Sequence, residues 1–253
     1  MPTNTVVLLK HVYDESQLKV DPATGGIDFS AVPGKMSSFD RNAVEEALRL
    51  RQQLGGTVTS LTLGTDAAVK SIREALAMGV DRAVLVRTSG ETDAYAAGAL
   101  LEKALARLQP WGLLLCAEGS TDTYTSLLPG MLAQRLGLPL ISYARSLKLD
   151  GGALVGERSL ERKTVTVRAA LPAIASVVSE INEPRIPTLL QIMGAAKKEL
   201  SVTQAESLGV TEQGYRTESM SGKGRERKRV VIEGPVQEAV SRLLDAMTRE
   251  GVV

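Results

Sequence analysis

The stretch that decides the fold is "GLLLCAEGSTDTYTSLLPGMLAQRLG", at residues 112–137. Its first part, "GLLLCA", is an uninterrupted apolar run of the kind found in strands that are buried on both faces. A loop rich in Ser, Thr and Asp follows, and then a helical pattern that ends at Gly137. Strand, loop and helix in this order form one repeat of an α/β fold.

The same alternation runs through the preceding residues. The strand-like runs are "TVVLLK" (5–10), "TVTSLTLG" (57–64) and "RAVLVRT" (82–88). The helical patterns are "RNAVEEALRLRQQL" (41–54), "DAAVKSIREALAMG" (66–79) and "TDAYAAGALLEKALARL" (92–108). Asp40 is predicted to cap the first helix and Gly55 to end it. Regular alternation predicts a parallel sheet with helices on both faces.

From residue 138 the pattern changes to short strand-like runs. They are "LPLISYARSLKL" (138–149), "GALVGERSL" (152–160), "KTVTVRAAL" (163–171) and "AIASVVSEIN" (173–182). Asp150, Gly151 and Gly152 between the first two are a hairpin signal. We expect antiparallel strands, either joined to the same sheet or packed beside it.

The C-terminal part is predicted to contain a helix near residues 189–198, a polar stretch at 214–229, a short strand "VVI" (230–232) and a final helix "PVQEAVSRLLDAM" (235–247). The final helix carries one apolar stripe, formed by Val236, Val240, Leu243, Leu244 and Met247. Such a stripe needs a surface to cover it, which either another chain or its own domain can supply.

Composition bounds the function. Thirty basic and 29 acidic residues nearly cancel, so no global charge favours nucleic acid. The only cysteine and the only histidine, Cys116 and His11, exclude an internal disulfide and leave few ligands for a metal, and none is predicted. The apolar run near the N-terminus is too short for a signal peptide or membrane span, so we expect a cytoplasmic protein.

Ligands of parallel α/β sheets sit beyond the carboxyl ends of the strands. Three segments are expected there: Lys10 and Asp14 after the first strand, residues 64–66 after the second, and the loop 118–126 after the fourth. The loop, followed by a helix N-terminus, suits a phosphate group. The alternative is that its polar residues only cap the helix. No "GxxxxGK" or "GxGxxG" motif is present.

The segment "NEPRIPTLLQIMGAAKK" at residues 182–198 is unusual for a core element. Two prolines precede a cluster of apolar residues, and lysines follow it. Apolar anchors on a proline-stiffened loop are typical of a protein-recognition surface. The other interpretation is that the segment packs on its own domain.

This segment closely resembles the recognition loop of electron transfer flavoprotein beta subunits. "AVEEALRL" (43–50), "IREALAMGVDRAV" (72–84) and "STDTYTSLLPGMLAQRLGLP" (120–139) resemble the same family in the same order. The similarity extends over about residues 6–210 and is weaker in the tail.

The resemblance implies an adenine-nucleotide-binding-like (nucleotide alpha hydrolase-like) α/β domain at residues 1–210, with antiparallel additions and a recognition loop at about 182–198. Residues 211–253 are implied to be a C-terminal arm that packs on a larger alpha subunit. That heterodimer shares FAD, and the beta subunit usually holds AMP. Electrons arrive from dehydrogenases such as acyl-CoA dehydrogenases and leave through a quinone reductase. The beta subunit is implied to be an electron carrier and not an enzyme.

The resemblance also implies individual site residues. The cofactor-binding positions are Leu8, Ser37, Ser38, Phe39, Asp40, Leu63, Asp122, Thr123, Tyr124, Thr125, Ser126, Leu127, Leu128, Pro129, Gly130, Met131, Leu132 and Ala133. Among these, Phe39 corresponds to an aromatic residue placed against the flavin. The partner-binding positions are Glu183, Arg185, Leu189, Ile192 and Met193, with Leu189 as the leucine inserted into a dehydrogenase.

The chain departs from the family in places. "DTYTS" replaces an acidic "DDxNQ" type run, and Glu15 stands where many members have a tyrosine near the flavin. Two alternatives follow. One is an electron-bifurcating variant with a second FAD in the AMP pocket, and the other is a homodimeric nucleotide sensor of the universal-stress type.

Overall fold

The computed structural model describes residues 3–21, 23–90, 92–210, 214–222 and 229–253. The chain divides into two compact units. The first comprises residues 1–19 and 28–219, and the second comprises residues 20–27 and 220–253. Residues 211–213 and 223–228 of the predicted arm lie outside the described residues.

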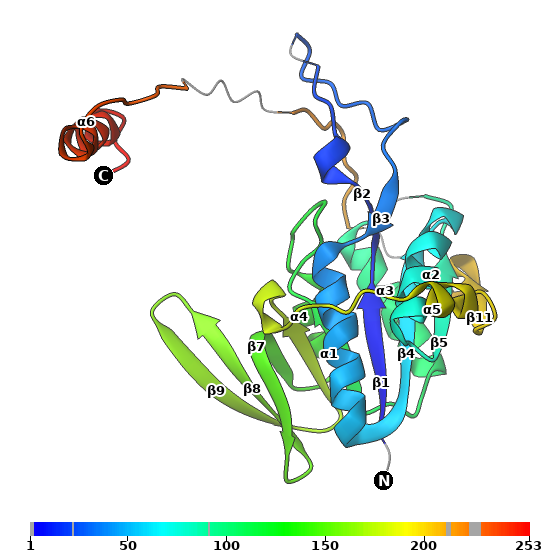
Figure 1. The fold of residues 1–253 in the computed structure, drawn as a ribbon. Coiled ribbons are helices and arrows are strands. Elements are labelled where there is room, and N and C mark those ends of the chain that lie inside the picture. The colour runs from blue at the N-terminus through cyan, green and yellow to red at the C-terminus, as the bar shows by residue number, and fades with distance from the viewer. Residues whose placement is uncertain (1–2, 22, 91, 211–213, 223–228) are drawn as a thin grey trace. The chain divides into compact units, whose positions relative to one another are not determined.

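The first unit is built on one nine-stranded sheet with the order β11-β5-β4-β1-β6-β10-β7-β8-β9. The strands from β11 to β7 in this order pair in parallel, and β7, β8 and β9 form an antiparallel meander (Figure 1). The bounds are β1 Thr3–Leu9, β4 Gly55–Gly64, β5 Arg82–Arg87, β6 Leu113–Ala117, β7 Leu140–Asp150, β8 Ala153–Leu160, β9 Lys163–Ala170, β10 Ala173–Val177 and β11 Leu200–Gln204.

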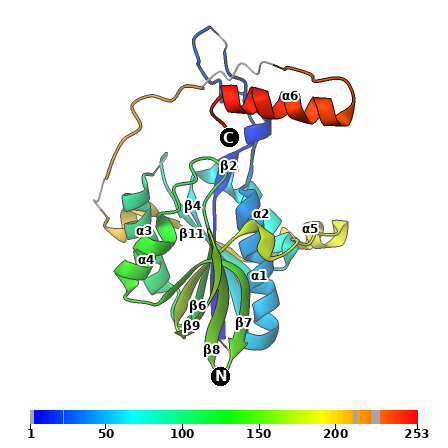
Figure 2. The same cartoon turned by 90° about the vertical axis from the view of Figure 1, so that its left-hand side faces the viewer.

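Helices cover both faces of the sheet. One face carries α1 (Ser38–Leu54), α2 (Val69–Met78) and α5 (Leu189–Ala195), and the other carries α3 (Ala94–Arg107) and α4 (Leu128–Leu136), as Figure 2 shows. Side chains alternate between the two cores along each central strand. In β1, Val7 and Leu9 face α1, whereas Val6 and Leu8 face α3. Burial on both faces explains why the strand sequences read as continuous apolar runs.

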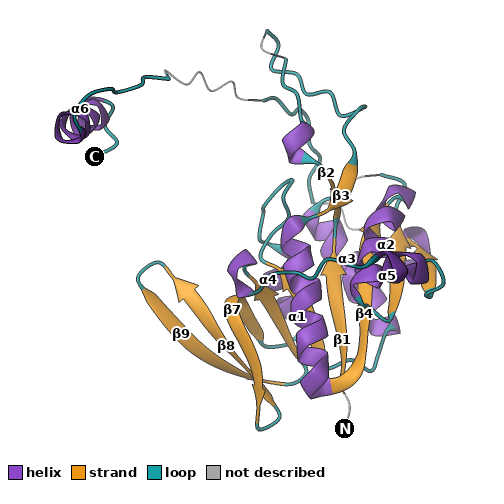
Figure 3. Ribbon diagram, viewed as in Figure 1, coloured by secondary structure: helices purple, strands orange, loops and turns teal. Residues whose placement is uncertain are grey.

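Two of the helices end at a glycine. Gly55 adopts a left-handed φ of 67° directly after α1, and Gly137 does the same after α4 with φ of 63°. These residues avoid the steric penalty of a Cβ in that conformation. The mostly parallel α/β fold predicted from the alternation is confirmed (Figure 3).

The structure corrects three local predictions and adds strands that were not predicted. The helix α1 begins at Ser38, two residues before the expected cap Asp40, whose side chain binds the end of β1 instead. The run at residues 173–182 is not antiparallel, because β10 inserts in parallel between β6 and β7. Residues 230–232 form no strand. The edge strand β11 and a small antiparallel pair, β2 (His11–Tyr13) with β3 (Gly34–Met36), were not predicted.

The second unit contains an isolated bridge between Val20 and Ile27, a hydrogen bond from Gly222 N to Gly25 O (2.7 Å), and the helix α6 (Val236–Arg249). None of the residues of α6 is buried. Within the described part of the chain, we find no helix with the length and apolar character needed to span a membrane.

Candidate functional site

Lys10 connects three elements at the carboxyl edge of the sheet. It follows β1 directly, and its backbone N–H donates to Asp40 Oδ2 at the start of α1 over 2.7 Å. Its Nζ lies 2.6 Å from Asp122 Oδ2 in the loop after β6. Two predicted site residues that are 82 positions apart, Asp40 and Asp122, are therefore held on either side of one lysine.

Asp40 is a buried carboxyl group, with 6% of its surface exposed. Burial raises the pKa of Asp40 to about 8, because the hydrogen bond from Lys10 N and the Lys10 charge only partly offset the loss of solvation, and Asp122 adds repulsion. The raised pKa favours the neutral carboxyl group of Asp40, whose Oδ2 accepts from Lys10 N.

Asp122 has the opposite electrostatic balance. Burial opposes its ionisation, but Lys10 and the hydroxyl of Ser120 outweigh burial and lower the pKa of Asp122. Ser120 Oγ donates to Asp122 Oδ1 over 2.5 Å, and Thr123 N donates to the same atom over 2.8 Å. The Asp122 carboxylate therefore holds the loop at residues 120–123 together through these hydrogen bonds.

The start of α4 is left without a side-chain cap. Its N-cap residue is Leu127, which is exposed and makes no capping hydrogen bond. The interpretation that the polar loop only caps α4 is therefore wrong. Tyr124 and Ser126 adopt left-handed φ values of 43° and 54°, an uncommon conformation for residues with a Cβ that is concentrated at ligand sites.

Two hydroxyl groups near this edge have no partner. Ser37 Oγ and Thr121 Oγ1 are buried and make no hydrogen bond in the described structure. Buried polar atoms normally have a hydrogen-bond partner, so two buried hydroxyls without one indicate that a ligand could supply it. With Lys10 and the uncapped α4, these hydroxyls fit an anionic, hydrogen-bonding ligand such as a nucleotide phosphate.

The other predicted cofactor positions are half-buried, exposed or buried. Phe39 is half-buried, and its ring lies 5.5 Å from that of Tyr124, so an aromatic pair borders the site. Ser38, Thr125 and Gly130 are exposed. Leu8, Pro129 and Leu132 are buried in the core, so their side chains are not available to a ligand. The remaining positions, Leu63, Leu128, Met131 and Ala133, are half-buried.

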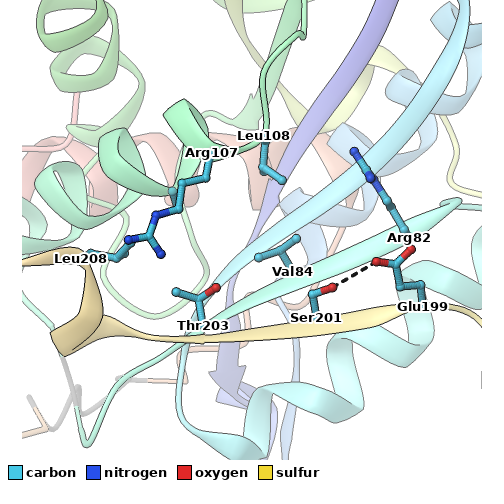
Figure 4. A pocket seen from close by; sticks show the side chains of 9 residues that line it. Arg82, Val84, Arg107, Leu108, Glu199, Ser201, Thr203 and Leu208 are labelled. Carbon is cyan, nitrogen blue, oxygen red and sulfur yellow. Dashed lines mark hydrogen bonds between the residues drawn. The ribbon is translucent and has the colours of Figure 1, made fainter.

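Two hollows lie elsewhere on the domain. One of about 200 Å³ lies between β5, β11 and α3, and Figure 4 shows Arg82, Arg107 and Glu199 around it. A second, of about 240 Å³, is bordered by Thr88 and Glu206. Neither contains a residue of the Lys10 site. The predicted site is therefore separate from these two hollows.

Glu15, the position occupied by tyrosine in many relatives, is paired. Lys35 Nζ lies 3.0 Å from Glu15 Oε2 and 2.9 Å from Asp14 Oδ1. The ammonium group partly neutralises the two carboxylates. Sequence spacing did not reveal that Lys35 pairs with Glu15.

The segment at 182–198 presents its apolar residues to solvent. Leu189 is 71% exposed, Ile192 54% and Met193 63%, so the interpretation that they pack on their own domain is wrong. Ile186 and Leu190, which were not among the predicted partner-binding residues, are 91% and 80% exposed and belong to the same surface. Glu183 and Arg185 are also exposed, and Arg185 forms an ion pair with the buried Glu45.

Fold and site together define an α/β protein with a polar, charged strand-end edge around Lys10 and an exposed apolar surface at residues 186–193. The family profile described as "Electron transfer flavoprotein domain" matches residues 24–208. The chain is 32% identical over 260 residues to the electron transfer flavoprotein subunit beta of Thermoanaerobacterium thermosaccharolyticum, covering 99% of this chain and all of that protein. It is 37% identical over 216 residues to the corresponding subunits of Mycobacterium leprae and Mycobacterium tuberculosis, covering 82% of this chain and 81% of each relative.

The chain therefore belongs to the electron transfer flavoprotein family. The resemblance stated from the sequence is confirmed, and the role of the chain is electron transfer.

Proposed function

We propose that this chain is the small subunit of a heterodimeric electron transfer flavoprotein. It shares one FAD with an alpha subunit, accepts electrons from dehydrogenases such as acyl-CoA dehydrogenases, and passes them to a quinone reductase. It carries out no chemistry on a substrate of its own. The observation that carries the proposal is the exposed apolar surface at residues 186–193, with Ile186, Leu189 and Leu190 at 91%, 71% and 80% exposure.

The residues at the strand-end edge fit the AMP that the family usually holds. Ser37 Oγ and Thr121 Oγ1 offer unpaired hydroxyls, Lys10 offers a positive charge, and the uncapped start of α4 offers backbone N–H groups. AMP would act there as a structural ligand.

Phe39 is the residue of this chain that we assign to the shared flavin. FAD, when bound, supplies the ring that takes up and releases electrons. The half-buried Phe39 offers an apolar face for that ring, and Tyr124 supports Phe39 from the other loop. The apolar stripe of α6 is assigned to the alpha subunit, as part of an arm at residues 211–253.

Co-purification tests the proposal. The chain is co-expressed with a cognate alpha subunit, and the complex is examined by absorption spectroscopy and nucleotide analysis. One FAD and one AMP per heterodimer is the expected result. Two FAD and no AMP per heterodimer would favour the electron-bifurcating variant over the proposed function. A colourless homodimer that does not bind the alpha subunit would reject the proposal and favour the sensor.

A further inference from the structure

Three polar residues of α1 are buried along one face of the helix. Asn42, Glu45 and Glu46 are 7%, 4% and 5% exposed, and the spacing of three and four places them side by side. Two buried carboxyl groups on one helix are uncommon unless each has partners. Each of the three has a partner at the start of the segment at 182–198, and Arg49 of α1 adds ion pairs to Glu45 and Glu46 over 3.3 and 4.0 Å.

Arg185 holds Glu45 in a two-pronged ion pair. Arg185 Nε donates to Glu45 Oε2 over 2.6 Å and Nη2 donates to Oε1 over 2.9 Å, while the backbone N–H of Arg185 donates to Oε2 over 3.2 Å. This geometry fixes direction as well as distance. Burial opposes the charge of Glu45, but Arg185 outweighs it, so the pKa of Glu45 lies below its usual value.

Asn42 and Asn182 bind each other reciprocally. Asn42 Nδ2 donates to Asn182 O over 2.8 Å and to Ser179 O over 2.9 Å. Asn182 Nδ2 donates back to Asn42 O over 3.1 Å and to Glu46 Oε2 over 3.0 Å. The start of the segment is therefore bound to α1 through both backbone and side chains.

The end of the segment is bound to α2. Arg73 Nη1 donates to the carbonyls of Ala195 and Lys198 over 2.8 and 3.1 Å. Lys198 Nζ donates to the carbonyls of Leu76 and Val80 over 2.9 and 2.6 Å. In Figure 1 the yellow segment crosses α1 before it reaches α5 beside α2.

We propose that these two anchors are a positioning device for the docking surface, with Arg185 and Glu45 as its main positioning residues. The inference rests on the proposed function. The exposed apolar residues 186–193 are held at both ends. Glu45, which binds Arg185 at the first end, lies on the same helix as Phe39, six residues further along. The anchors therefore fix the position of the exposed apolar residues relative to the start of α1, which we assign to the flavin. Arg185 acts through Glu45 and not by direct contact with the dehydrogenase.

The test compares Arg185→Gln, Arg185→Lys, Glu45→Gln and the double variant Glu45→Gln/Arg185→Gln in the purified heterodimer. Arg168→Gln is the matched control, because Arg168 Nη1 also pairs with a carboxylate, Asp150 Oδ2, over 2.7 Å, but on β9. Hydrogen exchange of residues 186–195 and steady-state reduction of the flavin by a purified acyl-CoA dehydrogenase are measured.

Arg185→Gln should accelerate exchange at residues 186–195 by about tenfold or more while the strands of the core keep their protection. It should raise the dehydrogenase's KM for the flavoprotein by about five- to twentyfold and leave kcat within about twofold, because lost preorganisation weakens docking. Arg185→Lys should recover part of the loss, and the double variant should be no worse than Arg185→Gln, because both changes break one pair. Arg168→Gln should change neither readout.

Unchanged exchange at residues 186–195 would overturn the inference, as would a fall in kcat and folded yield with an unchanged KM, which is what a purely structural role predicts. Failure of the proposed function can be distinguished from failure of this inference. It would appear as wild-type protein without flavin or without an alpha subunit, and the exchange measurement would still report on the anchors.

Discussion

Two helices of this chain, α5 and α6, expose apolar side chains in different ways. α5 begins with a capping box, in which Thr188 Oγ1 accepts from Gln191 N and Gln191 Oε1 accepts from Thr188 N. Its last residue, Ala195, is buried, and the flanking Arg185 and Lys198 are anchored on α1 and α2. α6 begins at Val236, its N-cap residue Pro235 makes no side-chain cap, and none of its residues is buried.

The difference indicates two kinds of interface. A surface that is held in shape before binding loses little entropy when a partner docks, which suits brief contacts with several dehydrogenases. An isolated helix of 14 residues is marginally stable in water and gains its stability from the surface that covers it. We therefore assign α5 to transient docking and α6 to a permanent interface.

The largest effect is expected on α6. The double variant Val240→Glu/Leu244→Glu should weaken binding of the alpha subunit by about a hundredfold or more, because each buried aliphatic side chain contributes about 1.5–3 kcal/mol. The thermal stability of the isolated chain should not change, since these residues are about half exposed in it. Analytical ultracentrifugation of the mixed subunits measures the affinity.

Arg249→Glu is the control for that variant, because it changes the charge by the same two units on the opposite face of α6. If the double variant binds as tightly as wild type, α6 does not lie in the subunit interface. If it lowers the stability of the isolated chain, the stripe is covered by this chain's own domain.

A second effect concerns the helix that supports the docking segment. The folded-state pKa of Asp40 is raised to about 8, so between about pH 4 and pH 8 the native chain binds a proton that the unfolded chain has released. The contribution of Asp40 is fully present below the unfolded pKa and is lost as pH rises through 8. The slope is at most about 1.4 kcal/mol per pH unit.

Asp40→Asn should remove this slope, because the amide oxygen can still accept from Lys10 N without ionising. Urea unfolding of the isolated wild-type chain and of the variant between pH 5 and pH 8.5 gives the difference. Parallel curves for the two proteins would contradict the raised pKa of Asp40. A variant that is less stable at every pH would show that the carboxyl group has a further partner.

The sequence predicted those features that local patterns encode. Continuous apolar runs such as residues 5–9 identified strands buried on both faces, and Gly55 identified the end of α1. The start of α1 was missed because an Asp before a helix can either cap it or, as Asp40 does, bind a neighbouring strand. The parallel position of β10 depends on a crossover that no local pattern encodes.

The candidate site shows the same limit. The loop at 118–126 was placed at the sheet edge from its position after a strand, but its salt bridge to Lys10 spans 112 residues and its uncapped helix is a matter of geometry. The exposed surface at 186–193 was named from an apolar cluster beside prolines, which alone could equally have been core. The pairing of Arg185 with Glu45 joins residues 140 positions apart and has no local signature.

Leu189→Ala tests the anchored surface with a smaller change. It should raise the dehydrogenase's KM for the flavoprotein by about tenfold or more, since a buried leucine contributes about 1.5–3 kcal/mol to the complex. Flavin content and melting temperature should stay at their wild-type values, because Leu189 is 71% exposed. Leu160→Ala, at a partly exposed leucine on β8, is the control. Loss of flavin or of several degrees in melting temperature would mean that Leu189 is a core residue.

The smallest effects are expected at the starts of the two helices, because α5 has a capping box and α6 has no side-chain cap. Thr188→Ala removes the capping box of α5 and should destabilise that helix by about 0.5–2 kcal/mol. Pro235→Ser introduces a hydroxyl three residues before Glu238 and so completes a capping-box pattern for α6. Hydrogen exchange of both helices measures the changes.

Thr188→Ala should accelerate exchange in α5 only modestly, because the anchors at Arg185 and Lys198 still hold both ends of the segment. Pro235→Ser should slow exchange in α6 of the isolated chain and have less effect in the heterodimer, where the partner already orders the helix. If α5 responded as strongly as an isolated helix to loss of its cap, the anchors would not fix its conformation. In that case α5 and α6 would be supported alike, and their assignment to different kinds of interface would lose its physical basis.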